Sequence, residues 1–94
     1  MNIEKLIKEK KGTIVDVRTP AEFSGGKAAD SINIPLQELE RKLEDIKNME
    51  KPIILCCASG GRSGMAEMML SQAQIECCNA GSWLDVNYYQ SLNS

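Results

Sequence analysis

The feature that most constrains the fold is an unbroken apolar stretch at residues 53–57, which reads Ile-Ile-Leu-Cys-Cys. A strand with one face in water alternates apolar and polar residues, because successive side chains point to opposite faces. A continuous apolar run instead indicates a strand that is buried on both faces, as in parallel sheets covered by helices. The stretch therefore predicts the central strand of a layered α/β domain.

The rest of the chain alternates between extended and helical patterns around this strand. Further strands are predicted over residues 13–17, 32–34 and 75–78. Helices are predicted over residues 2–10, 36–49, 62–73 and 82–92. A capping box at Thr19-Pro20-Ala21-Glu22 predicts one more short helical turn. Such alternation predicts a three-layer α/β/α fold with a central, mainly parallel sheet, as a single domain over residues 1–94.

Composition restricts the chemistry and the partners. The chain has no histidine, so catalysis would rely on cysteine, carboxylate, lysine, arginine or tyrosine side chains. The net charge of −2 gives no basic surface signature, and we expect no nucleic-acid partner. There is no run of 18 apolar residues and no secretory signal pattern at the N-terminus, so we expect no membrane partner and a cytoplasmic location. The four cysteines form two adjacent pairs, 56–57 and 77–78. This spacing does not suit zinc, so we expect reduced thiols and no metal.

The segment 57–63 carries the chemistry. Cys57 ends the predicted central strand, four small residues follow, and Arg62 opens the next predicted helix. In open parallel sheets, ligands bind outside the carboxyl ends of the strands. Small residues let backbone N–H groups turn inward, so this loop and the helix N-terminus can form a concavity that stabilises the Cys57 thiolate. Arg62 is expected to contact an anionic substrate or to buttress the loop. In the alternative interpretation, Cys57 is only a small buried hydrophobe.

Four segments of this sequence resemble motifs of the rhodanese-like sulfurtransferases. Residues 57–63, Cys-Ala-Ser-Gly-Gly-Arg-Ser, match the family's loop pattern Cys-x-x-Gly-x-Arg-Ser. Residues 16–23 match Asp-Val-Arg-x-x-x-Glu-Phe, and residues 32–35 give Ile-Asn-Ile-Pro. Residues 80–83, Ala-Gly-Ser-Trp, are similar to the family's closing Gly-Gly-Trp region. The chain departs from the family at residues 26–28, where Gly-Lys-Ala replaces a frequent Gly-His-Ile.

The resemblance implies a sheet of four or five strands and a sulfurtransferase of the thiosulfate type that needs no cofactor. Cys57 would be the catalytic residue and would carry sulfur as a persulfide in a ping-pong reaction. The implied substrate-binding residues are Ala58, Ser59, Gly60, Gly61, Arg62 and Ser63. Asp16 and Arg18 would form a supporting ion pair that braces the active-site loop. The alternative interpretation is a partly exposed pair worth roughly 0–1 kcal/mol.

The resemblance also implies the partners. The donor would be a small sulfur compound such as thiosulfate or a persulfide, and the acceptor would be cyanide, a thiol or a sulfur-relay protein. The family often has a basic residue directly after the catalytic cysteine, and this chain has Ala58 there.

Two alternative functions stay open. The first is a non-catalytic rhodanese-like interaction or sulfur-relay module, although the intact Cys57, Gly60 and Arg62 favour an enzyme. The second is a cysteine-dependent phosphatase, because Cys56 and Arg62 are separated by five residues as in a phosphatase loop. Only four residues separate Cys57 from Arg62, which makes a tighter loop than the phosphatase spacing, and the residue directly before Cys56 is Leu55. Both observations make the phosphatase the weaker alternative.

Several other residues are predicted to be structural. Cys56 is expected to point to the opposite face of the strand from Cys57 and to pack in the core. Met65, Met68 and Met69 have helical spacing and are predicted to be core residues. Trp83 is predicted to pack at the rim of the site. At least one residue of the pair 77–78 is expected to be packed, and a redox role for the other stays open.

Overall fold

The computed structural model describes residues 2–92, and every structural statement below concerns these residues. The sheet contains β1 (Thr13–Asp16), β2 (Ile32–Asn33), β3 (Ile53–Cys57) and β4 (Cys77–Ser82). The strands are parallel in the order β2-β1-β3-β4, so β3 lies inside the sheet and β4 at its edge. All five residues of β3 are buried. The predicted parallel α/β fold is therefore confirmed, with four strands in the described part of the chain.

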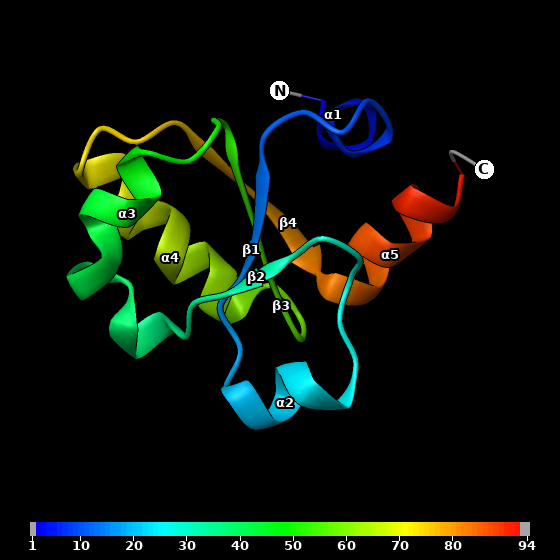
Figure 1. The fold of residues 1–94 in the computed structure, drawn as a ribbon, viewed down its shortest axis with the longest axis horizontal. Coiled ribbons are helices and arrows are strands. Elements are labelled where there is room, and N and C mark those ends of the chain that lie inside the picture. The colour runs from blue at the N-terminus through cyan, green and yellow to red at the C-terminus, as the bar shows by residue number, and fades with distance from the viewer. Residues whose placement is uncertain (1, 93–94) are drawn as a thin grey trace.

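Helices cover both faces of the sheet (Figure 1). On one face, α3 (Leu43–Lys47) and α4 (Gly61–Gln72) pack on a core that contains Leu55 and Cys57. On the other face, α1 (Ile3–Lys8) and α5 (Trp83–Ser91) pack on a second core that contains Ile54 and Cys56. Figure 1 shows α2 (Pro20–Gly25) beyond the end of the sheet at which the β3–α4 loop lies. None of the helices between residues 2 and 92 is long and apolar enough to cross a membrane.

The two predicted helix starts with side-chain caps are confirmed. The Lys5 N–H donates to Asn2 Oδ1 over 3.0 Å and begins α1. In α2, Thr19 and Glu22 form the complete capping box, with each side chain bonded to the other residue's backbone N–H. Such caps satisfy N–H groups that have no partner within the first helical turn. The box fixes the position of Glu22, which matters for the site described below.

The single helix predicted over residues 36–49 is wrong. The segment forms two 3-10 turns, η1 (Leu36–Glu38) and η2 (Glu40–Lys42), before the short α3. Leu36 and Leu39 are three residues apart, the spacing that places side chains on the same side of a 3-10 turn. The Leu36 N–H donates to Val17 O over 3.1 Å, and the Leu39 side chain is fully buried. Tertiary contacts with Val17, just after β1, and with the core therefore override the helical pattern.

The last strand is displaced from its prediction at residues 75–78. Strand β4 begins at Cys77 and continues to Ser82, although Asn, Ala, Gly and Ser are poor strand formers. Pairing with β3 compensates for this weak propensity, with a bulge that leaves Ala80 without a partner between the pairs Leu55–Asn79 and Cys56–Gly81. Gly81 has a φ of 83°, a left-handed conformation that glycine adopts without strain. The extension places Asn79 beside the β3–α4 loop.

The predicted core role of the methionines is wrong for two of the three. The side chains of Met65 and Met68 are 58% and 64% exposed, whereas Met69 packs against the first core. Helix α4 turns Ala66 and Leu70 toward the sheet instead, and both are fully buried. The side of α4 that faces the sheet carries Ala66 and the residues three and four positions later, Met69 and Leu70. Met65 and Met68 lie outside this side of the helix.

Candidate active site

The loop between β3 and α4 surrounds the thiol of Cys57. Strand β3 ends at Cys57, and α4 begins at Gly61 after three irregular residues. Gly60 caps α4 with a φ of 103°, a left-handed conformation that side chains rarely adopt. This turn aims the Gly60 N–H at the Cys57 Sγ atom over 3.0 Å. The loop therefore places a backbone donor directly on the sulfur.

Ser63 adds two more contacts with the same sulfur. Its backbone N–H donates to Cys57 Sγ over 3.5 Å, and its hydroxyl oxygen lies 3.4 Å from Sγ. Burial by itself raises the pKa of the Cys57 thiol, but the hydrogen bonds from the Ser63 side chain and from the N–H groups of Ser63, Gly60 and Ser59 outweigh it. Together they lower the pKa of Cys57 to about 7. A thiolate therefore forms near neutral pH without a histidine base.

Cys56 differs sharply from its neighbour. Its side chain lies in the second core, on the opposite face of β3, and is fully buried as predicted. Burial raises the pKa of the Cys56 thiol to about 12, because no donor compensates for the lost hydration. The neutral Cys56 thiol is thus a packing group on the side of β3 away from the loop.

Arg62 binds a carboxylate of the protein itself. Its Nη1 and Nη2 atoms donate to Glu22 Oε1 and Oε2 over 2.7 and 3.0 Å, a bidentate pair that joins α4 to α2. The bond to Arg62, helped by the Thr19 N–H, lowers the pKa of the Glu22 carboxyl to about 2. Arg62 was expected either to contact an anionic substrate or to buttress the loop, and this geometry corresponds to the second role.

The Asp16–Arg18 pair is buried, which contradicts the alternative interpretation of a partly exposed pair. Arg18 Nε donates to both Asp16 oxygens over 2.9 Å, and Nη2 donates to Oδ2 over 2.7 Å. The guanidinium also donates to the carbonyls of Glu22 and Gly26 and lies 4.8 Å from the centre of the Trp83 ring. The pair therefore braces α2 and the following turn, and Glu22, whose carbonyl accepts from Arg18, connects it to Arg62 of α4.

Asn79 completes the loop, and sequence reasoning missed it. Its Oδ1 atom accepts from the Ser63 hydroxyl over 2.7 Å and from the Gly81 N–H over 2.9 Å. Its Nδ2 group donates to the Gly60 carbonyl over 3.2 Å. Asparagine is uncommon in strands, and Asn79 directly follows the strand predicted at residues 75–78. This position was the one sign in the sequence that could have pointed to a role for Asn79 in the site.

The predicted loop residues do not all share one environment. Gly60 and Ser63 contact the sulfur. Ala58, Ser59 and Gly61 are exposed at the mouth of the loop, and of these Ser59 also donates its backbone N–H to the sulfur. The four cysteines are free thiols. Cys78 is buried, and burial raises its pKa to about 11, whereas Cys77 is half-buried beside Ser71. Between residues 2 and 92, no group of three or more acidic, cysteine or histidine side chains could hold a metal ion.

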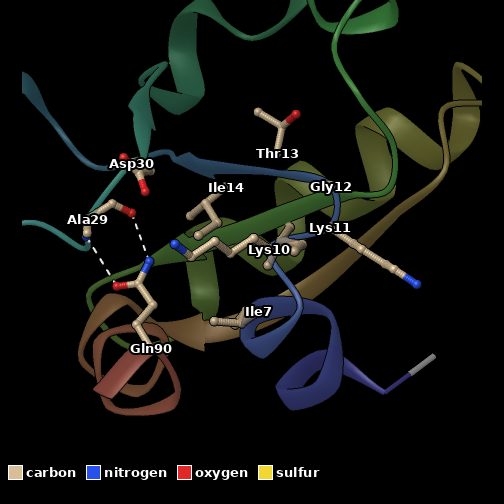
Figure 2. A pocket seen from close by; sticks show the side chains of 10 residues that line it. Ile7, Lys10, Lys11, Gly12, Thr13, Ile14, Ala29, Asp30 and Gln90 are labelled. Carbon is tan, nitrogen blue, oxygen red and sulfur yellow. Dashed lines mark hydrogen bonds between the residues drawn. The ribbon is translucent and has the colours of Figure 1, made fainter. Parts of the chain in front are cut away.

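A separate hollow of about 390 Å³ lies on the α1–α5 face of the sheet (Figure 2). Ile7, Ile14 and Ile54 form its apolar part, and Figure 2 shows Lys10 extending across it. The amide of Gln90 closes one side through two hydrogen bonds with the backbone of Ala29. None of the loop residues from Cys57 to Ser63 lines this hollow, so it is distinct from the candidate active site.

The fold and the site together define a class of proteins, namely parallel α/β domains with a thiolate-stabilising loop at the carboxyl end of a central strand. The model of the rhodanese-like domain family matches residues 2–89, and the chain belongs to this family.

The comparisons with individual proteins agree with this membership. The chain is 39% identical over 61 residues to the uncharacterised protein YqhL of Bacillus subtilis, which covers 65% of this chain and 48% of YqhL. It is 32% identical over 59 residues to a sulfurtransferase of Allochromatium vinosum, covering 63% of this chain and 54% of that one. A rhodanese-related protein of Thermoplasma volcanium superposes with a TM-score of 0.78 at 32% identity, covering 94% of this chain and 88% of the other. The chain spans about half or less of the curated relatives' length, and its family is one of sulfurtransferase and sulfur-relay domains.

Proposed function

We propose that this chain is a thiosulfate-type sulfurtransferase that carries sulfane sulfur as a persulfide on Cys57. The observation that carries the proposal is the set of hydrogen bonds that Gly60 and Ser63 donate to the Cys57 sulfur. They help to lower the pKa of the Cys57 thiol to about 7. These donors favour a negative charge at Sγ before any substrate arrives. The same chain contains no histidine, so the nucleophile depends on the loop alone.

The first half-reaction loads the enzyme. The Cys57 thiolate attacks the outer sulfur of thiosulfate, a new S–S bond forms at Sγ, and the original S–S bond breaks. Sulfite leaves with the electron pair, so no external oxidant or reductant is needed. The terminal sulfur of the persulfide is then negative, and the exposed loop from Ala58 to Gly61 offers N–H groups that would stabilise it, as an oxyanion hole does.

The second half-reaction unloads the sulfur. A cyanide ion or a thiolate attacks the terminal sulfur of the persulfide, and the Cys57 thiolate leaves. The same hydrogen bonds that lower the pKa of the thiol make it a good leaving group. Donor and acceptor thus bind in turn, which gives ping-pong kinetics. A persulfide donor in place of thiosulfate, and a relay protein as acceptor, fit the same scheme.

Intact-mass spectrometry after incubation with thiosulfate tests the proposal. We expect one added sulfur, about 32 Da, that cyanide or a reductant removes. Cys57→Ser should abolish this addition and the thiosulfate:cyanide activity, whereas Cys56→Ser is the matched control and should retain both. Cys56→Ser is expected to lose about 1–3 kcal/mol of stability if its hydroxyl has no partner. A wild-type protein that gains no sulfur from thiosulfate or from a persulfide would contradict the proposal.

The same variants address the two alternatives. A relay module would accept sulfur at Cys57 from a persulfide but show no turnover with thiosulfate and cyanide. A phosphatase would lose activity with Cys56→Ser and keep it with Cys57→Ser. The position of Cys56 behind the sheet, with a pKa of about 12, argues against that outcome.

A further inference from the structure

Asn79 is the only residue of β4 whose side chain bonds to both Gly60 and Ser63 within the described chain. Both residues donate hydrogen bonds to Cys57 Sγ. Asn79 comes from the edge strand, 16 residues beyond Ser63 and outside the loop itself. The mechanism above uses Gly60 and Ser63 but assigns nothing to Asn79.

The Ser63 hydroxyl has one proton and three acceptors within reach. They are Asn79 Oδ1 at 2.7 Å, the Gly60 carbonyl at 3.2 Å and Cys57 Sγ at 3.4 Å. With a neutral thiol, Ser63 donates to Asn79 and accepts from the S–H group. With a thiolate, the single proton turns to the sulfur, the bond to Asn79 is given up, and Asn79 Oδ1 keeps the bond from the Gly81 N–H. Asn79 therefore orients the Ser63 hydroxyl while the thiol is neutral, and it competes with the sulfur for the hydroxyl proton when the thiolate forms.

The other half of the Asn79 amide acts on Gly60. Its Nδ2 group donates to the Gly60 carbonyl, which also accepts the first helical bond of α4 from Gly64 N–H at 2.9 Å. Two donors on one carbonyl hold Gly60 in its left-handed conformation, and this conformation aims the Gly60 N–H at Sγ.

We propose that Asn79 is a positioning residue of the sulfur site, which acts through Gly60 to hold the Gly60 N–H on the Cys57 sulfur. Its effect on the thiolate is independent of the proposed reaction. Its effect on the persulfide rests on the proposed function, because the terminal sulfur would use the same loop.

Charged groups near the site do not provide a second route for this effect. Arg62 of α4 is paired with Glu22 of α2, and Asp16 of β1 is paired with Arg18. The Asp85 carboxylate of α5 lies beside Gly81, and Cys56 is neutral behind the strand. The hydrogen bonds found for the Asn79 side chain go to Gly60, Ser63 and Gly81, so its replacement by a neutral residue leaves those charges in place.

The test is the pH dependence of Cys57 alkylation by iodoacetamide, followed peptide by peptide by mass spectrometry. Asn79→Leu, which is similar in size, should move the alkylation midpoint upward by about one pH unit, or about tenfold less thiolate below the midpoint. Asn33→Leu is the matched control, because Asn33 is also a half-buried strand asparagine that bonds to backbone carbonyls, those of Asp16 and Arg18. It should leave the midpoint unchanged. In a Ser63→Ala background, where no hydroxyl proton is shared between Asn79 and the sulfur, Asn79→Leu should still raise the midpoint through Gly60.

A folded Asn79→Leu protein with the wild-type midpoint, or an equal shift with Asn33→Leu, would overturn the inference. If the leucine variant does not fold, nuclear magnetic resonance of the wild type decides the question. The Asn79 side-chain amide should then titrate with the Cys57 midpoint while the Asn33 amide does not, and a flat Asn79 signal would overturn the inference. Failure of persulfide loading in the wild type would instead contradict the proposed function alone.

Discussion

At the residue scale, four chemically identical thiols have four different environments. Three of them lose hydration without gaining donors strong enough to compensate, and burial raises the pKa of each. Cys57 is also buried, at 1% exposure, yet loop donors surround its sulfur. The reactivity of a cysteine therefore depends on the direction of nearby N–H groups more than on its exposure.

The first prediction concerns this difference. With a pKa of about 7, the Cys57 thiol is about half ionised at pH 7, and its alkylation rate should rise through pH 7 and level off above about pH 8. Cys56 and Cys78 should stay unmodified over this range in the folded protein. The lowered pKa also means that Cys57 stabilises the fold increasingly above pH 7 and fully above its ordinary value of 9.0. A midpoint near 9 for Cys57 would contradict the prediction.

The second prediction concerns Arg18. Removing its guanidinium in Arg18→Met would leave the fully buried Asp16 carboxylate without its partner. Breaking a buried pair in this way costs about 3–5 kcal/mol, which urea unfolding would measure. The double variant Asp16→Asn/Arg18→Met should recover part of the loss, because no charge is then left buried. A loss below about 1 kcal/mol would show that the pair is effectively solvated.

At the scale of elements, α2 and α4 are joined through Glu22 and Arg62, whose side chains are 37% and 36% exposed. Solvent screens such a pair, so Glu22→Gln should lower thermal stability only slightly at neutral pH. The lowered pKa of Glu22 means that its contribution is present above its ordinary value of 4.5 and is lost as the pH falls from there toward 2. The stability difference between wild type and Glu22→Gln should therefore vanish near pH 2. Thermal unfolding monitored by circular dichroism at several pH values would check this.

Helix α4 provides a direct comparison between buried and exposed positions. Leu70→Ala should cost about 2–5 kcal/mol, because Leu70 is fully buried in the first core. Met68→Ala should change stability by less than about 0.5 kcal/mol, because 64% of Met68 is exposed. Urea unfolding of both variants would test the corrected orientation of α4, and an equal loss would restore the original prediction of a methionine core.

Features that depend on neighbours along the chain could be predicted from the sequence. The buried strand at residues 53–57, the capping box at Thr19 and the composition of the Cys57 loop are of this kind. The partners of that loop were not predictable, because Glu22 reaches Arg62 across 40 residues and Asn79 reaches Ser63 across 16. The helical pattern at residues 36–49 misled for the same reason, since contacts with the core decided its conformation.

At the scale of the whole molecule, the two cores share one sheet. Ile54 and Leu55 are adjacent in β3 yet belong to opposite cores, so neither core can lose its packing without disturbing the strand that supports the other. We therefore expect one cooperative unfolding transition. Trp83, the single tryptophan, packs in the second core and reports on it by fluorescence. Its urea transition should coincide with that of far-ultraviolet circular dichroism, and two separated transitions would show that the cores unfold independently.

The opposite orientations of Cys56 and Cys57 also determine where a bound sulfur atom can go. A strand directs consecutive side chains to opposite faces, so the two thiols cannot meet to form a vicinal disulfide or to chelate an arsenical reagent. Cys77 pairs with Ile53 at the far end of β3, about 13 Å along the strand from Cys57, and Cys78 pairs with Ile54. If Cys57 carries sulfur, none of the other three cysteines of this sequence is placed to take the sulfur from it. The sulfur would then stay on Cys57 until an acceptor molecule enters the loop, so its release would depend on a molecule from outside the domain.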